Sequence, residues 1–257
     1  IQSHEIVKNL RPAIQAIAKK YNANAKLVEV PAGPPVLSTL VTEVYGPDYD
    51  EQIKLANEVK NLLASTGGIV DVDWMTEADQ PDYHLEVNKD KAMRSGIAPA
   101  QVVAVVQGAL SGMHAGVLHH PASYEPIGIT LQLTDADKAS VQDLRNLTIK
   151  GMYGNIVPVG DLVKITKEVK EKSIYRKNQK RVVYVMADMA GDLESPAYAM
   201  MQLSDSLKAL PVPAGYSITE EFNHQPEHED DYTIKWDGEW QITYEVFRDL
   251  GIAFVVV

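Results

Sequence analysis

Short apolar runs that alternate with segments of helical periodicity organise most of this chain. Residues 40–45 (LVTEVY) alternate well enough to be a strand, and residues 50–65 then place apolar side chains on one helical face. Those helical positions are Ile53, Ala56, Val59 and Leu63. Gly67 and Gly68 end the helix, and residues 69–75 (IVDVDWM) follow as a second strand. The pattern predicts a strand–helix–strand unit.

The same pattern returns late in the chain. Residues 181–189 form an apolar run, and Ser195 followed by Pro196 is typical of a helix N-terminus. The helix that follows carries its apolar side chains at Met200, Leu203 and Leu207. Residues 216–221 complete the unit as a strand. Two such units, about a hundred residues apart, predict an α+β fold of ferredoxin-like split β-α-β subdomains with an inserted α+β subdomain.

The residues between the two units have a different pattern. Residues 83–87 favour a strand, and Pro99 suits the first position of a helix. Residues 127–133, 147–150 and 162–169 also read as strands, separated by loops and one short helix. This arrangement is the one expected when one domain is interrupted by another.

The last residues, 251–257 (GIAFVVV), form an unbroken apolar run. A membrane-spanning helix needs about 20 apolar residues, so the run corresponds to the first turns of a span that is cut short. A buried final strand is the alternative, because valine is favoured in strands. Trp236, Trp240 and Tyr244 precede the run and suit an aromatic belt at a membrane interface, which favours the membrane interpretation.

Composition narrows the function classes. The 257 residues carry a formal net charge of −11, and no stretch interleaves basic with aromatic side chains, so nucleic acid is not an expected partner. The chain has no cysteine, which excludes disulfides, thiolate metal sites and cysteine nucleophiles. Residues 1–10 are polar and do not resemble a signal peptide.

Candidate catalytic or metal-binding residues are few. His119 and His120 precede a proline, which is typical of a loop tip, since neighbouring side chains do not easily share one ion. Residues 224–231 (HQPEHEDD) fit either a divalent-cation site or a solvated acidic loop, and we favour the loop. Asp71 and Asp73 alternate with valines, as in a half-exposed strand without an acid–base role.

The short motifs of metalloproteases, serine hydrolases, dinucleotide-binding proteins and P-loop proteins are all absent. We therefore expect no enzyme activity, no catalytic residue, no resident metal and no cofactor. A hydrolase that uses His224, Glu227 and His228 with a metal is the enzymatic alternative.

Four segments carry a resemblance to a known family. Residues 31–46 (PAGPPVLSTLVTEVYG), 81–102 (PDYHLEVNKDKAMRSGIAPAQV), 154–165 (GNIVPVGDLVKI) and 174–185 (IYRKNQKRVVYV) occur in the family's order, followed by the C-terminal KWDGEWQITYEVFRDLGIAFVVV. Together they resemble the acriflavine-resistance branch of RND efflux transporter inner-membrane subunits, in the second large periplasmic loop. The most specific signature is N-x-[DE]-K-A-x-x-x-G followed by a helix that opens with I-x-P.

The resemblance implies a domain plan. Residues 1–46 would be the C-terminal part of one porter subdomain, and residues 47–87 with 171–223 the two halves of the next. Residues 88–170 would be the inserted docking, or funnel, subdomain. Residues 224–257 would be a linker and the start of a transmembrane helix.

The resemblance also implies a substrate pathway. Matching positions of the family's entrance pocket are Lys26, Val28, Val30, Val41, Asp73, Met75 and Tyr184. Multidrug members carry aromatic side chains near the first of these positions and a basic residue near Asp73, and metal exporters carry a methionine on the first strand. Residues 25–30, a predicted strand, hold neither an aromatic residue nor a methionine.

The implied partners are those of a proton-driven pump. The family forms a homotrimer in the bacterial inner membrane and exports small-molecule substrates through a periplasmic adaptor and an outer-membrane duct. His114, His119, His120 and Tyr124 are the expected docking residues on the periplasmic side. A free-standing periplasmic binding or adaptor module is the non-enzymatic alternative.

Overall fold

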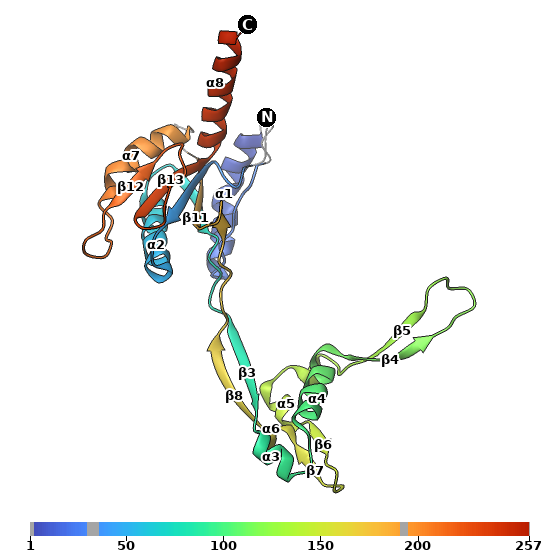
Figure 1. Ribbon diagram of the computed structural model, residues 1–257. Helices are drawn as coiled ribbons and strands as arrows, with labels where there is room; N and C mark the ends of the chain where they lie inside the picture. The colour runs from blue at the N-terminus through green and yellow to red at the C-terminus, as the bar shows by residue number, and fades with distance from the viewer. Residues whose placement is uncertain (1–2, 30–35, 191–194, 257) are drawn as a thin grey trace. The chain divides into compact units, whose positions relative to one another are not determined.

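The computed structural model describes residues 3–29, 36–190 and 195–256, and the chain divides into two compact units (Figure 1). Residues 1–78 and 172–257 form the first, here called the sheet unit, and residues 79–171 form the second, here called the inserted unit. None of the described helices is both long and apolar enough to cross a membrane.

The sheet unit is built around one five-stranded sheet. Its strands are β1 (Leu40–Tyr45), β2 (Ile69–Trp74), β11 (Val183–Met189), β12 (Ile218–Glu221) and β13 (Tyr232–Gly238). Its helices are α1 (Ser3–Lys20), α2 (Tyr49–Ser65), α7 (Pro196–Lys208) and α8 (Glu239–Val256), and β9 (Arg176–Lys177) with β10 (Lys180–Arg181) forms a short separate hairpin. The strand order is β12-β13-β1-β11-β2, parallel between β12 and β13 and antiparallel elsewhere.

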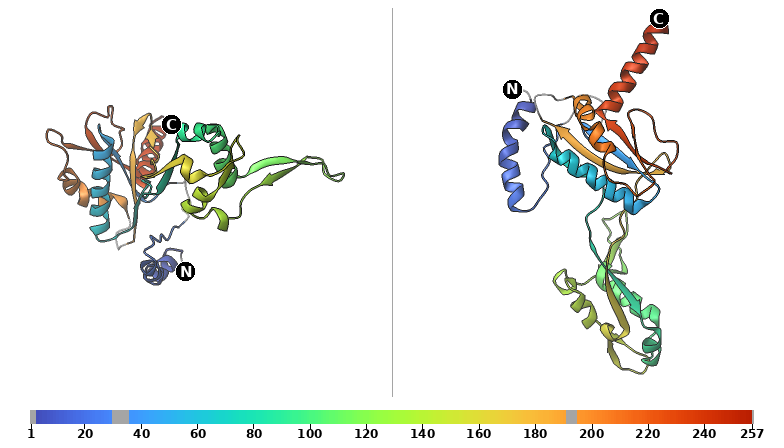
Figure 2. Two further views of the ribbon diagram at one scale, coloured as in Figure 1. Left: turned by 90° about the horizontal axis from the view of Figure 1, so that it is seen from below. Right: turned by 90° about the vertical axis from the view of Figure 1, so that its left-hand side faces the viewer.

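Two strand–helix–strand units, β1-α2-β2 and β11-α7-β12, supply four of the five strands. Helices α2 and α7 lie on the same side of the sheet (Figure 2) and bury their apolar faces in one core. Asp48 is the N-cap of α2, and its carboxylate accepts a hydrogen bond of 3.0 Å from the Glu51 amide. The core side chains of α2 are Leu55, Ala56, Val59 and Leu63. The predicted α+β fold with ferredoxin-like split β-α-β units is confirmed.

Strand β13 lies in the interior of the sheet, between β12 and β1. Residues 224–257 were expected to be a linker and the start of a transmembrane helix, whereas residues 232–238 form this strand. The strand escaped notice because its buried positions include the polar Thr233 and Lys235, which interrupt an apolar alternation. Trp236, interpreted above as a membrane-interface residue, is fully buried in the core.

Residues 251–256 of the apolar C-terminal run are helical and exposed. They form the last turns of α8, a helix without any buried residue that extends away from the sheet (Figure 2). Phe254, Val255 and Val256 each expose about three quarters or more of their surface. The alternative of a buried final strand is therefore wrong.

The inserted unit holds three two-stranded ladders and several short helices. Its strands are β3 (Pro81–Val87), β4 (Met113–Leu118), β5 (Ile127–Leu131), β6 (Thr148–Lys150), β7 (Ile156–Pro158) and β8 (Val163–Val169), paired β3–β8, β4–β5 and β6–β7. Its helices are α3 (Lys89–Arg94), α4 (Pro99–Ser111), η1 (Ala136–Lys138), α5 (Val141–Asn146) and α6 (Val159–Leu162). A small core joins α3, α4, β6 and α6.

The N-x-[DE]-K-A-x-x-x-G signature has a structural explanation in this unit. Asn88 caps α3 by accepting a 3.0 Å hydrogen bond from the Lys91 amide, and Ala92 is buried in the core. Gly96 adopts a φ of 67°, and a Cβ there would lie 2.9 Å from the Tyr153 ring. Three fixed residues of the motif, Asn88, Ala92 and Gly96, therefore serve the α3–α4 corner.

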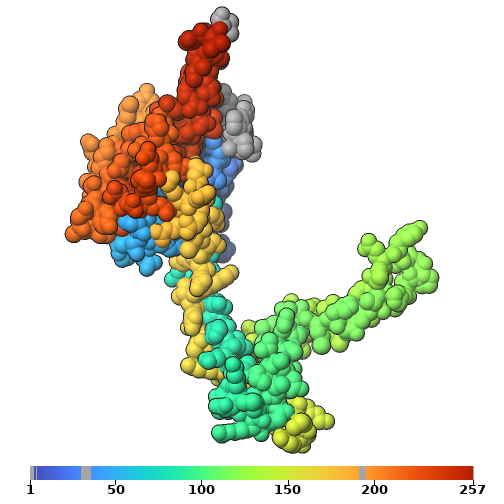
Figure 3. All heavy atoms as spheres, in the orientation of Figure 1, coloured from blue at the N-terminus to red at the C-terminus, as the bar shows by residue number. Residues whose placement is uncertain are grey.

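The β4–β5 hairpin projects from the rest of the inserted unit (Figure 3). Nearly all of its strand residues are exposed, including apolar ones. The larger apolar members are Met113, Val117, Leu118, Ile127, Ile129 and Leu131. An isolated hairpin of this kind has little stability in water unless its apolar side chains are covered.

Candidate functional site

A cleft of about 670 Å³ lies in the sheet unit. It is bounded by α1, the extended residues 23–29, the edge strand β2, the end of β11 and the first turn of α8. Its described lining is rich in charged residues and has no aromatic side chain: Ser3, Val7, Lys8, Arg11, Lys26, Leu27, Val28, Glu29, Val36, Leu37, Ser38, Thr39, Asp71, Asp73, Met186, Asp188, Met189, Ala190 and Glu239.

Two ion pairs cross this cleft from β2. The Arg11 guanidinium lies 2.5 Å from the Asp71 carboxylate, and the Lys26 ammonium contacts the Asp73 carboxylate. Asp71 also accepts a 3.1 Å hydrogen bond from the Leu27 amide. The side chains of Lys26 and Asp73 remain about one third exposed, so a solute in the cleft can reach this pair.

The predicted alternation of Asp71 and Asp73 on one exposed face is wrong. β2 and β11 form a bulge in which two residues, Asp71 and Val72, oppose Ala187 alone. Asp71 has a φ of 52°, and its side chain is only 1% exposed. Periodicity could not reveal this arrangement, because a bulge changes which side of the strand a residue faces.

The other end of the cleft also carries two carboxylates. Asp188 accepts hydrogen bonds from the Ser38 hydroxyl at 2.7 Å and from the Thr39 amide at 3.1 Å. Burial, followed by the charge of Asp188, raises the pKa of Glu239 in the first turn of α8. Negative charge is therefore only partly compensated at this end of the cleft.

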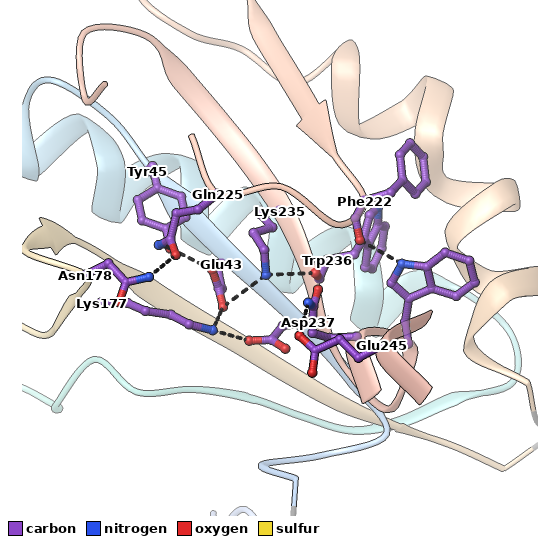
Figure 4. A network of polar contacts seen from close by, with 12 residues as sticks. Glu43, Tyr45, Lys177, Asn178, Phe222, Gln225, Lys235, Trp236, Asp237 and Glu245 are labelled. Atoms are coloured by element: carbon purple, nitrogen blue, oxygen red, sulfur yellow. Dashed lines mark hydrogen bonds and ion pairs between the residues drawn. The ribbon is translucent and has the colours of Figure 1, made fainter. Parts of the chain in front are cut away.

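A second polar cluster is buried within the same sheet unit (Figure 4). The Glu43 side chain is fully buried and receives hydrogen bonds from the Tyr45 hydroxyl at 2.6 Å and from the Lys177 ammonium at 2.5 Å. Lys177 also binds Asp237 at 2.6 Å, and Lys235 lies 3.6 Å from Glu43. The four ionised groups balance in charge, which is the condition under which buried charges are tolerated.

The carboxyl groups of this cluster differ in proton affinity. Burial raises the pKa of Glu43, and the neighbouring Asp237 adds to that shift. Burial disfavours ionised Asp237 as well, but its interactions with Glu43 and Lys177 bring its pKa down to about 2. Burial opposes the charged form of Lys177, yet its bonds to Asp237 and Glu43 raise its pKa overall.

The cluster holds the β9–β10 hairpin and the loop before β13 against the sheet. Asn178 donates to Gln225 at 2.5 Å, and Gln225 donates to the Tyr45 hydroxyl at 2.7 Å. Asn178 and Gln179 both have positive φ, as a two-residue hairpin turn requires. The polar groups bind each other, so we assign the cluster to structure. Sequence reasoning missed it, since its members are far apart in the chain.

The predicted substrate residues divide into those that line the cleft and those that do not. Lys26, Val28 and Asp73 line it. Val41 is buried and pairs with Met186, which in turn pairs with Asp73 across the sheet. Met75 and Tyr184 do not line the cleft, and the Met75 amide donates to the Tyr184 carbonyl at 3.0 Å. Val30 is outside the described residues.

The predicted docking residues lie together on the β4–β5 hairpin. His114 is on β4, and the other three are in the loop at the tip. That loop surrounds a hollow of about 290 Å³ lined by His119, His120, Pro121, Ser123, Tyr124, Glu125 and Pro126. Tyr124 is fully exposed.

The residues of the hydrolase alternative are not assembled into a site. His224, Glu227 and His228 are exposed on the loop between β12 and β13. Within residues 3–29, 36–190 and 195–256, no group of three or more His, Asp or Glu side chains is placed to hold a metal ion.

Comparison with known proteins gives consistent relatives. Protein HelA of Legionella pneumophila is 26% identical over 191 residues, 72% of this chain and 18% of its own length. The cobalt-zinc-cadmium resistance protein CzcA of Cupriavidus metallidurans is 24% identical over 193 residues, again 72% of this chain and 18% of its own. The chain thus spans less than a fifth of the length of these curated relatives.

A solved structure shares the fold. The crystal structure of a heavy metal efflux pump (crystal form I) superposes with a TM-score of 0.64 at 21% identity, covering 85% of this chain and 21% of the pump. The family model described as AcrB/AcrD/AcrF matches residues 2–234, which is most of the chain. The chain belongs to the AcrB/AcrD/AcrF family of RND efflux transporters.

Proposed function

We propose that this chain is the porter and docking portion of a proton-driven RND efflux transporter, with the cleft of the sheet unit on the substrate pathway. The exposed Lys26–Asp73 pair at the cleft carries the proposal, because it presents an exchangeable charge to a solute. The family match over residues 2–234 supports the transport class. The full proton relay and the translocation pathway belong to the complete transporter.

The partners proposed for the complete transporter follow from the family. The inserted unit would meet neighbouring protomers of a homotrimer and the periplasmic adaptor, which leads to an outer-membrane duct. The exposed apolar face of α8 supports an attachment to the inner membrane, which would place both units on its periplasmic side. The chain would act by binding and conformational change, without catalysis.

The cleft favours a charged substrate over a flat aromatic one. Its described lining offers no aromatic side chain for stacking, and it includes five carboxylates against three basic groups. Two relatives, CzcA and the nickel and cobalt resistance protein CnrA of Cupriavidus metallidurans, are named for resistance to cobalt, zinc, cadmium and nickel. We therefore propose that a cation, metallic or organic, replaces the Lys26 ammonium on Asp73. An aromatic multidrug substrate is the alternative.

Charge reversal at Asp73 tests the cleft in the complete transporter. Asp73→Lys places two ammonium groups together, so we expect about a tenfold change in the lowest inhibitory concentration of cationic substrates, equivalent to about 1.4 kcal/mol. Trimer assembly should be unchanged, because the pair is partly exposed. Growth of a pump-deleted host on zinc, cobalt, cadmium, nickel and cationic dyes provides the measurement.

Asp82→Lys is the matched control, since Asp82 is an exposed acid outside the cleft. A metal-only response to Asp73→Lys supports a metal substrate, and a dye-only response supports an organic cation. Unchanged susceptibility to every compound would remove Asp73 from the substrate pathway.

Shortening the β4–β5 hairpin tests the docking surface. Replacement of residues 119–126 by Asn-Gly closes the hairpin with a two-residue turn and removes the tip, including Tyr124. We expect a loss of resistance together with loss of adaptor or neighbour crosslinking, while the fold of the sheet unit is retained. Crosslinking in membranes and native mass spectrometry provide the measurement; normal assembly with normal efflux would contradict the docking role.

A further inference from the structure

The buried carboxylate of Asp71 joins three segments that are distant in the sequence. It lies on β2, yet it binds Arg11 of α1, 60 residues away, and the Leu27 amide, 44 residues away. Its side chain is 1% exposed, whereas that of the neighbouring Asp73 is 29% exposed. The Asp71 carboxylate is therefore enclosed by its partners at the cleft wall, whereas that of Asp73 stays accessible to a solute in the cleft.

The backbone at Asp71 is adapted to this task. A φ of 52° is unfavourable for most side chains but is tolerated by Asp and Asn. The bulge opposite Ala187 turns this residue out of the regular pleat of β2. The strained backbone at Asp71 lets one carboxylate bind both α1 and residues 23–29.

Residues 23–29 form one wall of the cleft without belonging to a sheet. No strand ladder fixes their position; the Ala23 amide donates to the Ala18 carbonyl at 3.0 Å, and side-chain contacts hold the residues that follow. These contacts include Gln15 to the Ala25 carbonyl at 2.9 Å, as well as Leu27 to Asp71. Because Lys26 precedes Leu27, the bond to Asp71 also sets how Lys26 meets Asp73.

We propose that Asp71 is the positioning residue of the cleft: it fixes α1 and residues 23–29 against β2 and so sets the Lys26–Asp73 pair. It touches no substrate in this role. The geometric part of the inference stands independently, and only its effect on transport rests on the proposed function.

Spin-label distances test the geometric part. The chain has no cysteine, so pairs of introduced cysteines carry the only labels. One pair, Ala16→Cys with Asn61→Cys, measures the distance between α1 and α2. A second pair, Asn24→Cys with Asn61→Cys, measures the distance from residues 23–29 to α2. All three positions are exposed. Double electron–electron resonance on the purified chain should give a single narrow distance for each pair in the parent protein.

The variants separate the two contacts of Asp71. Asp71→Ala should broaden the spin-label distance distribution of both pairs. Asparagine at position 71 keeps an acceptor for the Leu27 amide and tolerates the left-handed backbone. Asp71→Asn should therefore broaden the distance distribution only for the pair that reports α1. Arg11→Met should reproduce the Asp71→Asn result. Asp73→Asn is the matched control, and both distances should stay narrow in it.

Narrow parent-like distances in Asp71→Ala would overturn the inference. If that variant fails to fold, Asp71→Asn and Arg11→Met decide instead, and a parent-like α1 distance in both would overturn it. In the complete transporter, Asp71→Asn should change susceptibility to the same compounds as the Asp73 variant. Altered distances with unchanged susceptibility would leave the positioning role standing and contradict the proposed function.

Discussion

Replacing Glu43 by alanine is expected to lower the free energy of unfolding of the sheet unit by about 3 kcal/mol or more. The change removes the acceptor shared by Tyr45, Lys177 and Lys235. Lys235 is buried and would retain only a 3.3 Å bond to the Trp236 carbonyl, which leaves its charge without a counter-ion among these groups. The cost comes chiefly from that stranded charge.

Tryptophan fluorescence in urea measures this effect selectively. Trp74, Trp236 and Trp240 are the only tryptophans in the sequence, and all lie in the sheet unit. Unfolding of the inserted unit therefore does not contribute directly to the signal. Glu51→Ala is the control, because the exposed Glu51–Lys54 pair should contribute less than about 1 kcal/mol.

A paired apolar replacement separates charge burial from packing. Glu43→Leu with Lys235→Met removes both charges and keeps the side-chain volume, so it should recover most of the stability that Glu43→Ala loses. The Lys177–Asp237 pair remains intact in this variant. A loss below about 1 kcal/mol in Glu43→Ala would show that solvent already screens the cluster.

The sequence predicted well those parts of the fold that have a simple period. The predicted strand at residues 40–45 coincides with β1, although both of its faces are buried. The predicted helix at residues 50–65 differs from α2 by one residue, because one face of that helix is apolar. β13 and the Glu43 cluster could not be found in this way. Glu43 and Lys177 are 134 residues apart, and their charges mimic exposed positions.

The candidate site was predictable only in part. Resemblance pointed to Lys26 and Asp73, and the structure places these two in direct contact. The role of Asp71 could not be inferred, since it depends on a bulge and on partners from two other segments. Long-range geometry of this kind has no signature in local periodicity.

Trp236→Ala is expected to destabilise the sheet unit by about 4 kcal/mol, because truncating a fully buried tryptophan leaves a large cavity. The change also removes the 2.7 Å bond from the indole nitrogen to Glu220, whose side chain is fully buried. Urea unfolding followed by the fluorescence of Trp74 and Trp240 measures the loss. The magnitude follows from β13 being an integral strand of the core.

Trp240→Ala provides the matched comparison, since Trp240 lies at the start of α8 and is only partly buried. Its indole donates to the Phe222 carbonyl at 2.7 Å, so a loss of about 1 kcal/mol is expected. If Trp236 and Trp240 both lay in a linker or a membrane-interface segment, both substitutions would lower the free energy of unfolding of the purified chain equally little. A large difference between them therefore separates β13 from α8, although both were assigned to one segment on sequence alone.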